Sequence, residues 1–284
     1  MGEPSPRGRR KQLARRFKSL RERSGMTLEE VCTRLRISRS TLNRFETGER
    51  LVRFCEMQSL LDLYGVTVDR WPEYEEMYDA AKERPWWRAY GVDDRGYVPL
   101  EADASEVREF SLGYIPGLLQ TSDYAYATFR GGLGRLSGDK LRNAVTVRAI
   151  RRQRLTSADN PLRLMAVLDE AALYRLVGNR AVMAAQLAHL GDVAALDTVT
   201  LRILPTDAGC HAALPGSFSL LSFDHLGEPD MAYAEHPLGA INTDRAAMVR
   251  TATIRFDRLR SDALSPAESV ALIQRAADRY EGPA

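Results

Sequence analysis

The sequence predicts a mainly α-helical chain in two parts, an N-terminal domain of five helices and a C-terminal α+β domain with a small antiparallel sheet. Two observations favour this fold class. Apolar residues recur at helical spacing over residues 1–85, and strand-like segments are grouped late in the chain. Pro85 ends the helical part, so we expect one domain at residues 1–85 and a second at residues 86–284.

The composition limits the classes of protein to which the chain can belong. The chain has 284 residues, of which 44% are hydrophobic, enough for two hydrophobic cores. Its three cysteines are scattered and too few for a disulfide framework, so we expect a reducing cytoplasm. Because no apolar run reaches the length of a membrane-spanning helix, we expect no membrane contact.

The charge is strongly segregated along the chain. Residues 1–53 hold 15 basic and 6 acidic residues, a net charge of +9. The rest of the chain holds 25 basic and 32 acidic residues, a net charge of −7. A basic head on an acidic body indicates a polyanionic partner for the head, although a solvated basic arm would show the same composition.

The first two helices are predicted from apolar spacing and capping residues. Residues 10–24 place apolar side chains at positions i, i+4 and i+7, and Gly25 ends the helix. Residues 28–35 form a short second helix. Thr27 is a suitable N-cap for it, and Glu30, three residues later, completes a capping box.

The third helix has an unusually narrow apolar stripe. Ser38 caps it, Leu42 and Phe45 form its inner side, and Gly48 follows it. A short helix, a turn and a second helix with outward hydrogen-bond donors form the geometry that enters a major groove of DNA. The alternative is an ordinary helical bundle with a polar face. The excess of basic residues in this part of the chain favours the DNA-binding geometry. The outward residues of the third helix are Arg39, Ser40, Thr41, Asn43 and Arg44.

Two further helices are predicted at residues 54–64 and 66–85.

Residues 26–50, MTLEEVCTRLRISRSTLNRFETGER, resemble the helix-turn-helix of the Cro/repressor-type (xenobiotic-response-element, XRE) regulators. The resemblance extends from Gln12 to Tyr64. The sequence departs from the family at Arg36, where the turn usually carries glycine; a non-glycine residue at positive φ is disfavoured, so the turn angle is expected to differ. The resemblance implies base contacts from Arg39, Ser40 and Arg44, and phosphate contacts from Thr41, Asn43 and the basic N-terminal residues, among them Arg9 and Arg10. Thr27 is also predicted to be a DNA-binding residue.

The second domain is predicted to alternate helices and strands. Short loops between the late strands favour an antiparallel α+β arrangement over a parallel one. A basic run over residues 148–154, with arginine at 148, 151, 152 and 154, is more typical of a solvated helix face than of a DNA contact. Strands are predicted at 107–112, 162–169, 199–205, 217–223 and 230–236, and helices ending near 129 and at 138–156, 170–177, 180–195, 243–260 and 266–279.

Several segments of this second domain resemble one known domain, including GYIPGLLQTSDYA (113–125), GSFSLLSF (216–223) and ALSPAESVALI (263–273). They are similar to the uncharacterised domain that follows such helix-turn-helix modules in many regulators of filamentous soil bacteria. The resemblance covers nearly all of residues 86–284. It implies a regulator of development or antibiotic production, often encoded beside a small partner protein, and it implies no catalytic residues.

The sequence offers no catalytic or metal-binding pattern. Cys210 and His211 are adjacent, and the other potential ligands nearby are single, so the close pair typical of a zinc site is missing. Ser217 lacks the G-x-S-x-G elbow of a hydrolase nucleophile. We therefore predict no metal, no cofactor and no enzymatic activity.

Two functional hypotheses follow from the residues and the resemblance. The first is a sequence-specific transcriptional regulator: a cytoplasmic, nucleoid-associated homodimer that binds double-stranded DNA, with a C-terminal domain that binds a small partner protein or ligand. The alternative is an antitoxin-like protein that sequesters a small neighbouring protein and autoregulates its own operon. A toxic neighbour silenced by this chain would favour the second, and occupancy of many distant promoters would favour the first.

Overall fold

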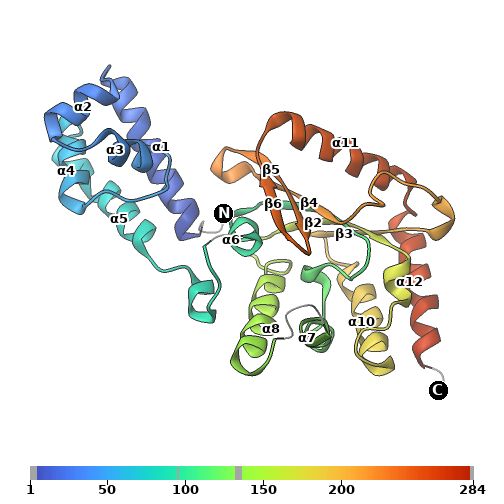
Figure 1. Ribbon diagram of the computed structural model, residues 1–284. Coiled ribbons are helices and arrows are strands. Elements are labelled where there is room, and N and C mark those ends of the chain that lie inside the picture. The colour runs from blue at the N-terminus through green and yellow to red at the C-terminus, as the bar shows by residue number, and fades with distance from the viewer. Residues whose placement is uncertain (1–4, 95, 132–135, 282–284) are drawn as a thin grey trace. The chain divides into compact units, whose positions relative to one another are not determined.

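The computed structural model describes residues 5–94, 96–131 and 136–281. It confirms the predicted fold class, a mainly helical chain with an N-terminal helical region and a C-terminal region that contains a small sheet (Figure 1). The chain divides into two compact units between Arg88 and Ala89. The short 3₁₀ helix η2 (Trp86–Tyr90) spans this division.

The first unit is built from the five predicted helices. Its core contains the stripe residues of the third helix, since Leu42 and Phe45 are fully buried. The ring of Phe17 packs edge-to-face against the rings of Phe45 and Tyr74, at centroid distances of 5.1 and 5.6 Å. The elements are α1 (Pro6–Arg23), α2 (Leu28–Leu35), α3 (Arg39–Glu46), α4 (Phe54–Leu63), the 3₁₀ helix η1 (Val68–Arg70) and α5 (Trp71–Lys82).

Gly48 is required by close packing as well as by its backbone angle. Its φ is +72°, and a Cβ added there would lie 2.9 Å from Cγ and 3.0 Å from Cα of Lys11. The chain leaving α3 therefore passes against α1 at a position that only glycine fits. The sequence predicted the helix end at this glycine, and the structure adds the contact with α1.

The second unit contains one sheet, in which the described residues form six strands in the order β3-β2-β1-β4-β5-β6. The sheet is mixed: β1 pairs parallel with β2 and β2 with β3, whereas β1, β4, β5 and β6 pair antiparallel in succession. The strands are β1 (Glu106–Ser111), β2 (Arg163–Asp169), β3 (Val199–Leu204), β4 (Phe218–Phe223), β5 (Glu228–His236) and β6 (Gly239–Thr243).

The prediction of an antiparallel sheet was therefore wrong for two of the five strand pairings, β1 with β2 and β2 with β3. It holds for β1 with β4 and for the pairings among β4, β5 and β6, which follow one another through short connections. It fails for β1 to β3 because helices separate them in sequence, and a parallel pair needs a crossover of that length. The helices of the unit are α6 (Tyr97–Asp103), α7 (Ser122–Gly131), α8 (Gly138–Gln153), α9 (Ala171–Tyr174), α10 (Arg180–Val193), α11 (Ala246–Asp262) and α12 (Pro266–Glu281).

Helices cover both faces of the sheet. Figure 1 shows α7, α8, α10 and α12 on one face and α11 on the other. Alternate side chains of β1 enter two different cores: Val107 packs with the first helix layer, and Phe110 packs with Phe256 and Leu259 of α11. Among the described helices, none is both long and apolar enough to cross a membrane.

The sequence favoured a solvated helix face for the arginines of residues 148–154. The structure contradicts this prediction. Arg151 is buried and donates two hydrogen bonds of 2.6 Å to the carboxylate of Glu101. Arg148 donates a hydrogen bond to the side-chain oxygen of Gln120, and Arg152 donates one to the backbone oxygen of Gln120, each at 2.6 Å. These guanidinium groups hold α6 and the segment before α7 against α8, because each carries several donors in a fixed fork.

Candidate nucleic-acid interface

The two helices of the predicted motif begin with the expected caps. Thr27 accepts a hydrogen bond from the backbone N–H of Glu30, and the Glu30 carboxylate accepts one from the Thr27 N–H at 2.8 Å. This second bond lowers the pKa of Glu30 from its usual value. Ser38 accepts a bond of 3.0 Å from the N–H of Thr41 at the start of α3. Both caps satisfy backbone donors that a helix start leaves unpaired.

The turn between α2 and α3 depends on a residue with a left-handed backbone. Arg36 has φ 52° and ψ 38°, and it is the one non-glycine residue at positive φ in the part of the chain that the structure describes. Its N–H donates to the carbonyl of Cys32, which ends α2. The turn therefore keeps a glycine-like conformation with an arginine in place, at a steric cost.

Helix α3 presents polar side chains on the side opposite its buried stripe. Arg39, Ser40, Asn43 and Arg44 are exposed, whereas Thr41 is half-buried. The Thr41 hydroxyl lies 2.8 Å from the hydroxyl of Ser38, so it takes part in the cap. Four of the five predicted α3 contacts thus share the exposed surface of one helix.

The two predicted base-reading arginines each form an exposed ion pair. Arg39 lies 2.5 Å from a carboxylate oxygen of Glu29, and Arg44 lies 3.5 Å from one of Glu49. All four side chains are at least half exposed. Such pairs contribute about 0–1 kcal/mol, so either arginine can exchange its carboxylate for a nucleic acid at little cost.

A partly buried ion pair fixes the orientation of α3. Arg21 on α1 donates hydrogen bonds of 2.7 and 2.9 Å to the carboxylate of Glu46, the last residue of α3. A third bond reaches the carbonyl of Met26 before α2. The Glu46 carboxylate raises the pKa of Arg21. Arg21 is a positioning residue that the sequence reasoning missed; its only sequence signal was a glutamate at the end of α3.

The remaining predicted contacts lie elsewhere on the unit. Thr27 is exposed at the start of α2, but its hydroxyl is engaged in the capping box. Arg9 and Arg10 belong to α1, which begins at Pro6, and are partly buried. Arg9 forms a 2.7 Å ion pair with Glu83 after α5, so a phosphate contact by Arg9 would require it to leave this carboxylate.

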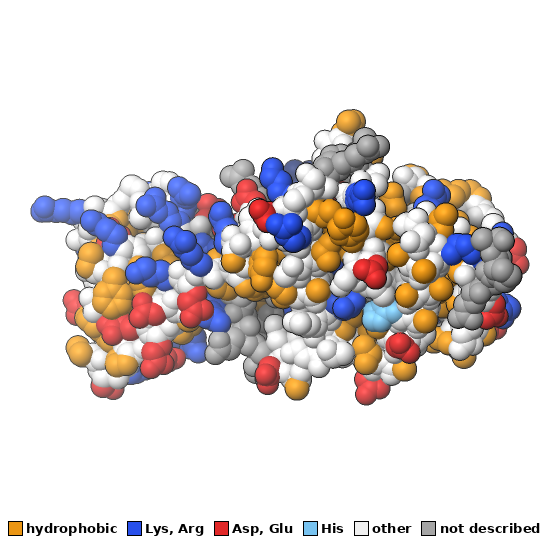
Figure 2. All heavy atoms as spheres, turned by 90° about the horizontal axis from the view of Figure 1, so that it is seen from below, with side chains coloured by type: hydrophobic (Ala, Val, Ile, Leu, Met, Phe, Trp, Pro, Cys, Tyr) orange, Lys and Arg blue, Asp and Glu red, His pale blue; other side chains and the backbone are white. Residues whose placement is uncertain are grey.

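Charge is unevenly distributed over the surface of the first unit. Figure 2 shows Lys and Arg side chains spread over one part of its visible surface, and Asp and Glu side chains gathered on another. A surface divided in this way orients an approaching polyanion and speeds its association.

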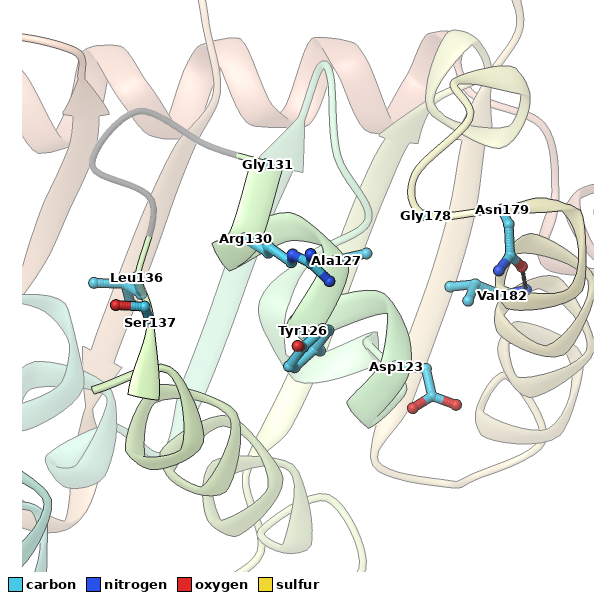
Figure 3. A pocket seen from close by; sticks show the side chains of 10 residues that line it. All are labelled: Asp123, Tyr126, Ala127, Arg130, Gly131, Leu136, Ser137, Gly178, Asn179 and Val182. Carbon is cyan, nitrogen blue, oxygen red and sulfur yellow. Dashed lines mark hydrogen bonds between the residues drawn. The ribbon is translucent and has the colours of Figure 1, made fainter. Parts of the chain in front are cut away.

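The second unit contains a cleft of about 810 Å³ between α7, the start of α10 and the residues before α8. Figure 3 shows the lining side chains on these three segments, with the side-chain oxygen of Asn179 accepting a hydrogen bond from the N–H of Val182. The volume is within the range of small-molecule sites, about 300–1,000 Å³. The sequence reasoning did not identify this cleft. Its lining residues are Asp123, Tyr126, Ala127, Arg130, Gly131, Leu136, Ser137, Gly178, Asn179 and Val182.

The loop with Cys210 and His211 does not assemble a metal site among the residues that the structure describes. His211 is nearly buried, and its Nε2 lies 3.7 Å from a carboxylate oxygen of Asp169, beyond hydrogen-bonding distance. Cys210 is exposed. Within the described ranges, no three His, Cys, Asp or Glu side chains lie close enough to hold a metal ion.

Comparison with known families agrees with the geometry of the first unit. A helix-turn-helix domain matches residues 12–73, so this unit belongs to a class of folds that serves DNA binding. A domain of unknown function, DUF5753, matches residues 94–275, more than half of the chain. The chain therefore belongs to the DUF5753 family. No curated protein and no solved structure matches it.

Proposed function

We propose that this protein is a sequence-specific transcriptional regulator of the XRE type that reads double-stranded DNA with helix α3. The observation that carries this proposal is the exposed surface of α3, where Arg39, Ser40, Asn43 and Arg44 project from a helix whose opposite side is buried. Its N-terminal turn is capped through Ser38. A recognition helix contacts base edges mainly with the residues near its N-terminal end, where Arg39 and Ser40 lie, whereas Arg44 is in the last turn of α3.

The residue types suit base and phosphate contacts. Arginine can donate two hydrogen bonds to the O6 and N7 atoms of guanine, and serine can bond several base edges. We assign base reading to Arg39, Ser40 and Arg44, and phosphate contact to Asn43 and Thr41. Arg9 and Arg10 are also assigned phosphate contacts, and Thr27 is included among the proposed DNA-binding residues.

The second unit is proposed to supply dimerisation and the binding of a small partner protein or ligand. A single helix-turn-helix reads few base pairs and buries only about 600–1,000 Å² on DNA as a single module. A two-fold dimer reads two half-sites about one helical turn apart and solves this problem. The cleft between α7 and α10 is the candidate ligand site. The proposed setting is the nucleoid, in control of development or specialised metabolism.

Substitution of Arg44 tests the assignment of α3. A preferred duplex is first selected from a random library with the wild-type protein. We expect Arg44→Ala to weaken binding to this duplex by about 1–3 kcal/mol, or about 5- to 150-fold, and to relax one base preference, because a bidentate base contact is lost. Binding is measured by titration at one fixed salt concentration.

Arg70→Ala is the matched control. Arg70 is in the same unit, its side chain is 54% exposed against 50% for Arg44, and its ion pair with Glu73 measures 3.4 Å against 3.5 Å for Arg44 with Glu49. We expect this variant to bind the selected duplex with wild-type affinity. Equal losses on selected and random duplexes would show that Arg44 contacts phosphate and does not read a base.

A further inference from the structure

The two edge strands of the sheet in the second unit, β3 and β6, differ in whether other segments of the chain cover them. At the β3 edge, the N–H of Ile203 donates to the hydroxyl of Ser269, and its carbonyl accepts from the N–H of Leu264, both at 2.9 Å. Arg202 also donates to the carbonyl of Leu264. Helix α12 and the residues just before it therefore pair with backbone groups at the edge of β3 within the same chain.

The β6 edge is exposed to solvent. Four of the five residues of β6 are exposed, and β5 is the one strand that pairs with β6 among the described strands. A strand between two neighbours uses both sides of its backbone, whereas no described strand pairs with the donors and acceptors on the outer side of β6. Two apolar side chains on or next to β6 are exposed. Leu238 in the β5–β6 turn is 92% exposed, and Ile241 in the centre of β6 is 61% exposed.

The residues of β6 lack the features that usually prevent edge pairing. Natural edge strands are protected by charged side chains, by proline or by a bulge. The sequence of β6 is GAINT, which contains no charge and no proline, and its register with β5 is regular over all five pairs. Its neighbour β5, by contrast, carries four charged or titratable side chains: Glu228, Asp230, Glu235 and His236.

We propose that β6 pairs antiparallel with β6 of a second copy of the chain, so that the two sheets join across a two-fold axis. This inference names the surface of the proposed homodimer and rests on that part of the proposed function. A two-fold interface places the same surface opposite itself. An uncharged strand tolerates this placement, whereas a charged one would repel its copy.

The pairing has a defined register when the five residues of β6 overlap fully. Ile241 then lies opposite Ile241 of the second copy, and Gly239 lies opposite Thr243. Directly opposed residues of an antiparallel pair have Cα atoms about 4.5–5.5 Å apart, within the distance that a disulfide can bridge. The two copies of residue 238 would lie about 20 Å apart, from a rise of about 3.4 Å per residue.

Cysteine cross-linking of the full-length protein tests this register. The exposed Cys55 and Cys210 are first replaced with serine. In that background we expect Ile241→Cys to form a disulfide-linked dimer under mild oxidation, and Leu238→Cys to form little. The control is stringent because Leu238 is more exposed than Ile241, so random collision would favour it. Equal or stronger cross-linking through position 238 would overturn the proposal.

A charge placed at the two-fold axis tests the same interface without cross-linking. We expect wild-type protein to sediment as a dimer at micromolar concentration in the absence of DNA, and Ile241→Lys to sediment as a monomer. The matched control is Leu176→Lys, because Leu176 is 59% exposed and outside β6; we expect it to remain dimeric.

The outcomes separate this inference from the proposed function. A dimer that Ile241→Lys does not dissociate uses another surface and overturns the inference. A monomeric wild-type protein would also overturn the inference, even if that monomer bound the selected duplex. In that case, the β6 edge could pair only with a strand of another protein. A dimer through β6 that binds no DNA would instead refute the DNA-binding function and leave this interface standing.

Discussion

Replacing Arg36 with glycine should stabilise the helix-turn-helix unit. Arg36 ends α2 with a left-handed backbone, φ 52° and ψ 38°, and its side chain is exposed. In this conformation the Cβ of any L-residue approaches the following carbonyl oxygen, whereas glycine has no Cβ. The substitution relieves this contact and leaves the buried core untouched.

The size of the effect follows from two opposing contributions. Relief of the left-handed conformation contributes about 1–2 kcal/mol. The greater freedom of glycine in the unfolded chain offsets about 0.5–1 kcal/mol of this gain. We therefore expect a net stabilisation of about 0.5–1 kcal/mol, which lowers the opening equilibrium constant of the unit about two- to fivefold.

Hydrogen exchange in the full-length protein measures this change. The amides of α2 and α3 are followed by mass spectrometry, because the two units need not unfold together. Arg36→Ala is the matched control: it removes the same charge and keeps the Cβ. We expect the glycine variant to exchange more slowly than both the wild type and the alanine variant. If glycine and alanine have the same effect, the reasoning from backbone strain is refuted.

Further predictions concern other residues. Urea denaturation should show a loss of about 3–5 kcal/mol for Glu101→Ala, which leaves the buried Arg151 unpaired, but a loss below about 1 kcal/mol for Arg163→Ala, which removes only exposed ion pairs. Ser38→Ala removes the cap of α3 and should speed exchange of its amides by the equivalent of about 1 kcal/mol. Burial, together with nearby Glu101, raises the pKa of Glu109 from 4.5 to about 7. The folded state then binds the proton more tightly than the unfolded chain, so stability falls as the pH rises from about 4.5 to about 7 and is level above. Glu109→Gln should remove this fall, at most about 3 kcal/mol, when urea midpoints at pH 5 and pH 8 are compared.

Local signals predicted the first unit well. The capping box of Thr27 and Glu30, the cap at Ser38 and the buried pair Leu42 and Phe45 are all found as the sequence indicated. Each of these features involves residues within one turn of one another, so sequence spacing is sufficient to predict it. The exposed side of α3 follows directly, because a helix that buries a narrow stripe must expose the rest.

The second unit was predicted less completely because its determinants are distant in sequence. The sequence located five strands but not β6, whose short segment GAINT shows little alternation. It also did not predict that β1 and β2 run parallel, because strand direction depends on where the intervening helices pack. The burial of Arg151 depends on Glu101, fifty residues earlier, and no local pattern reports such a partner.

The sequence by itself determined the helices of the first unit, their caps and the residues that α3 exposes, since helical periodicity and capping are properties of neighbouring residues. Only the tertiary structure decided the orientation of α3 by the pair of Arg21 with Glu46. It also decided which edge of the sheet is covered and which is exposed. These features arise from contacts between segments that are far apart in the chain, which form only when the whole chain packs.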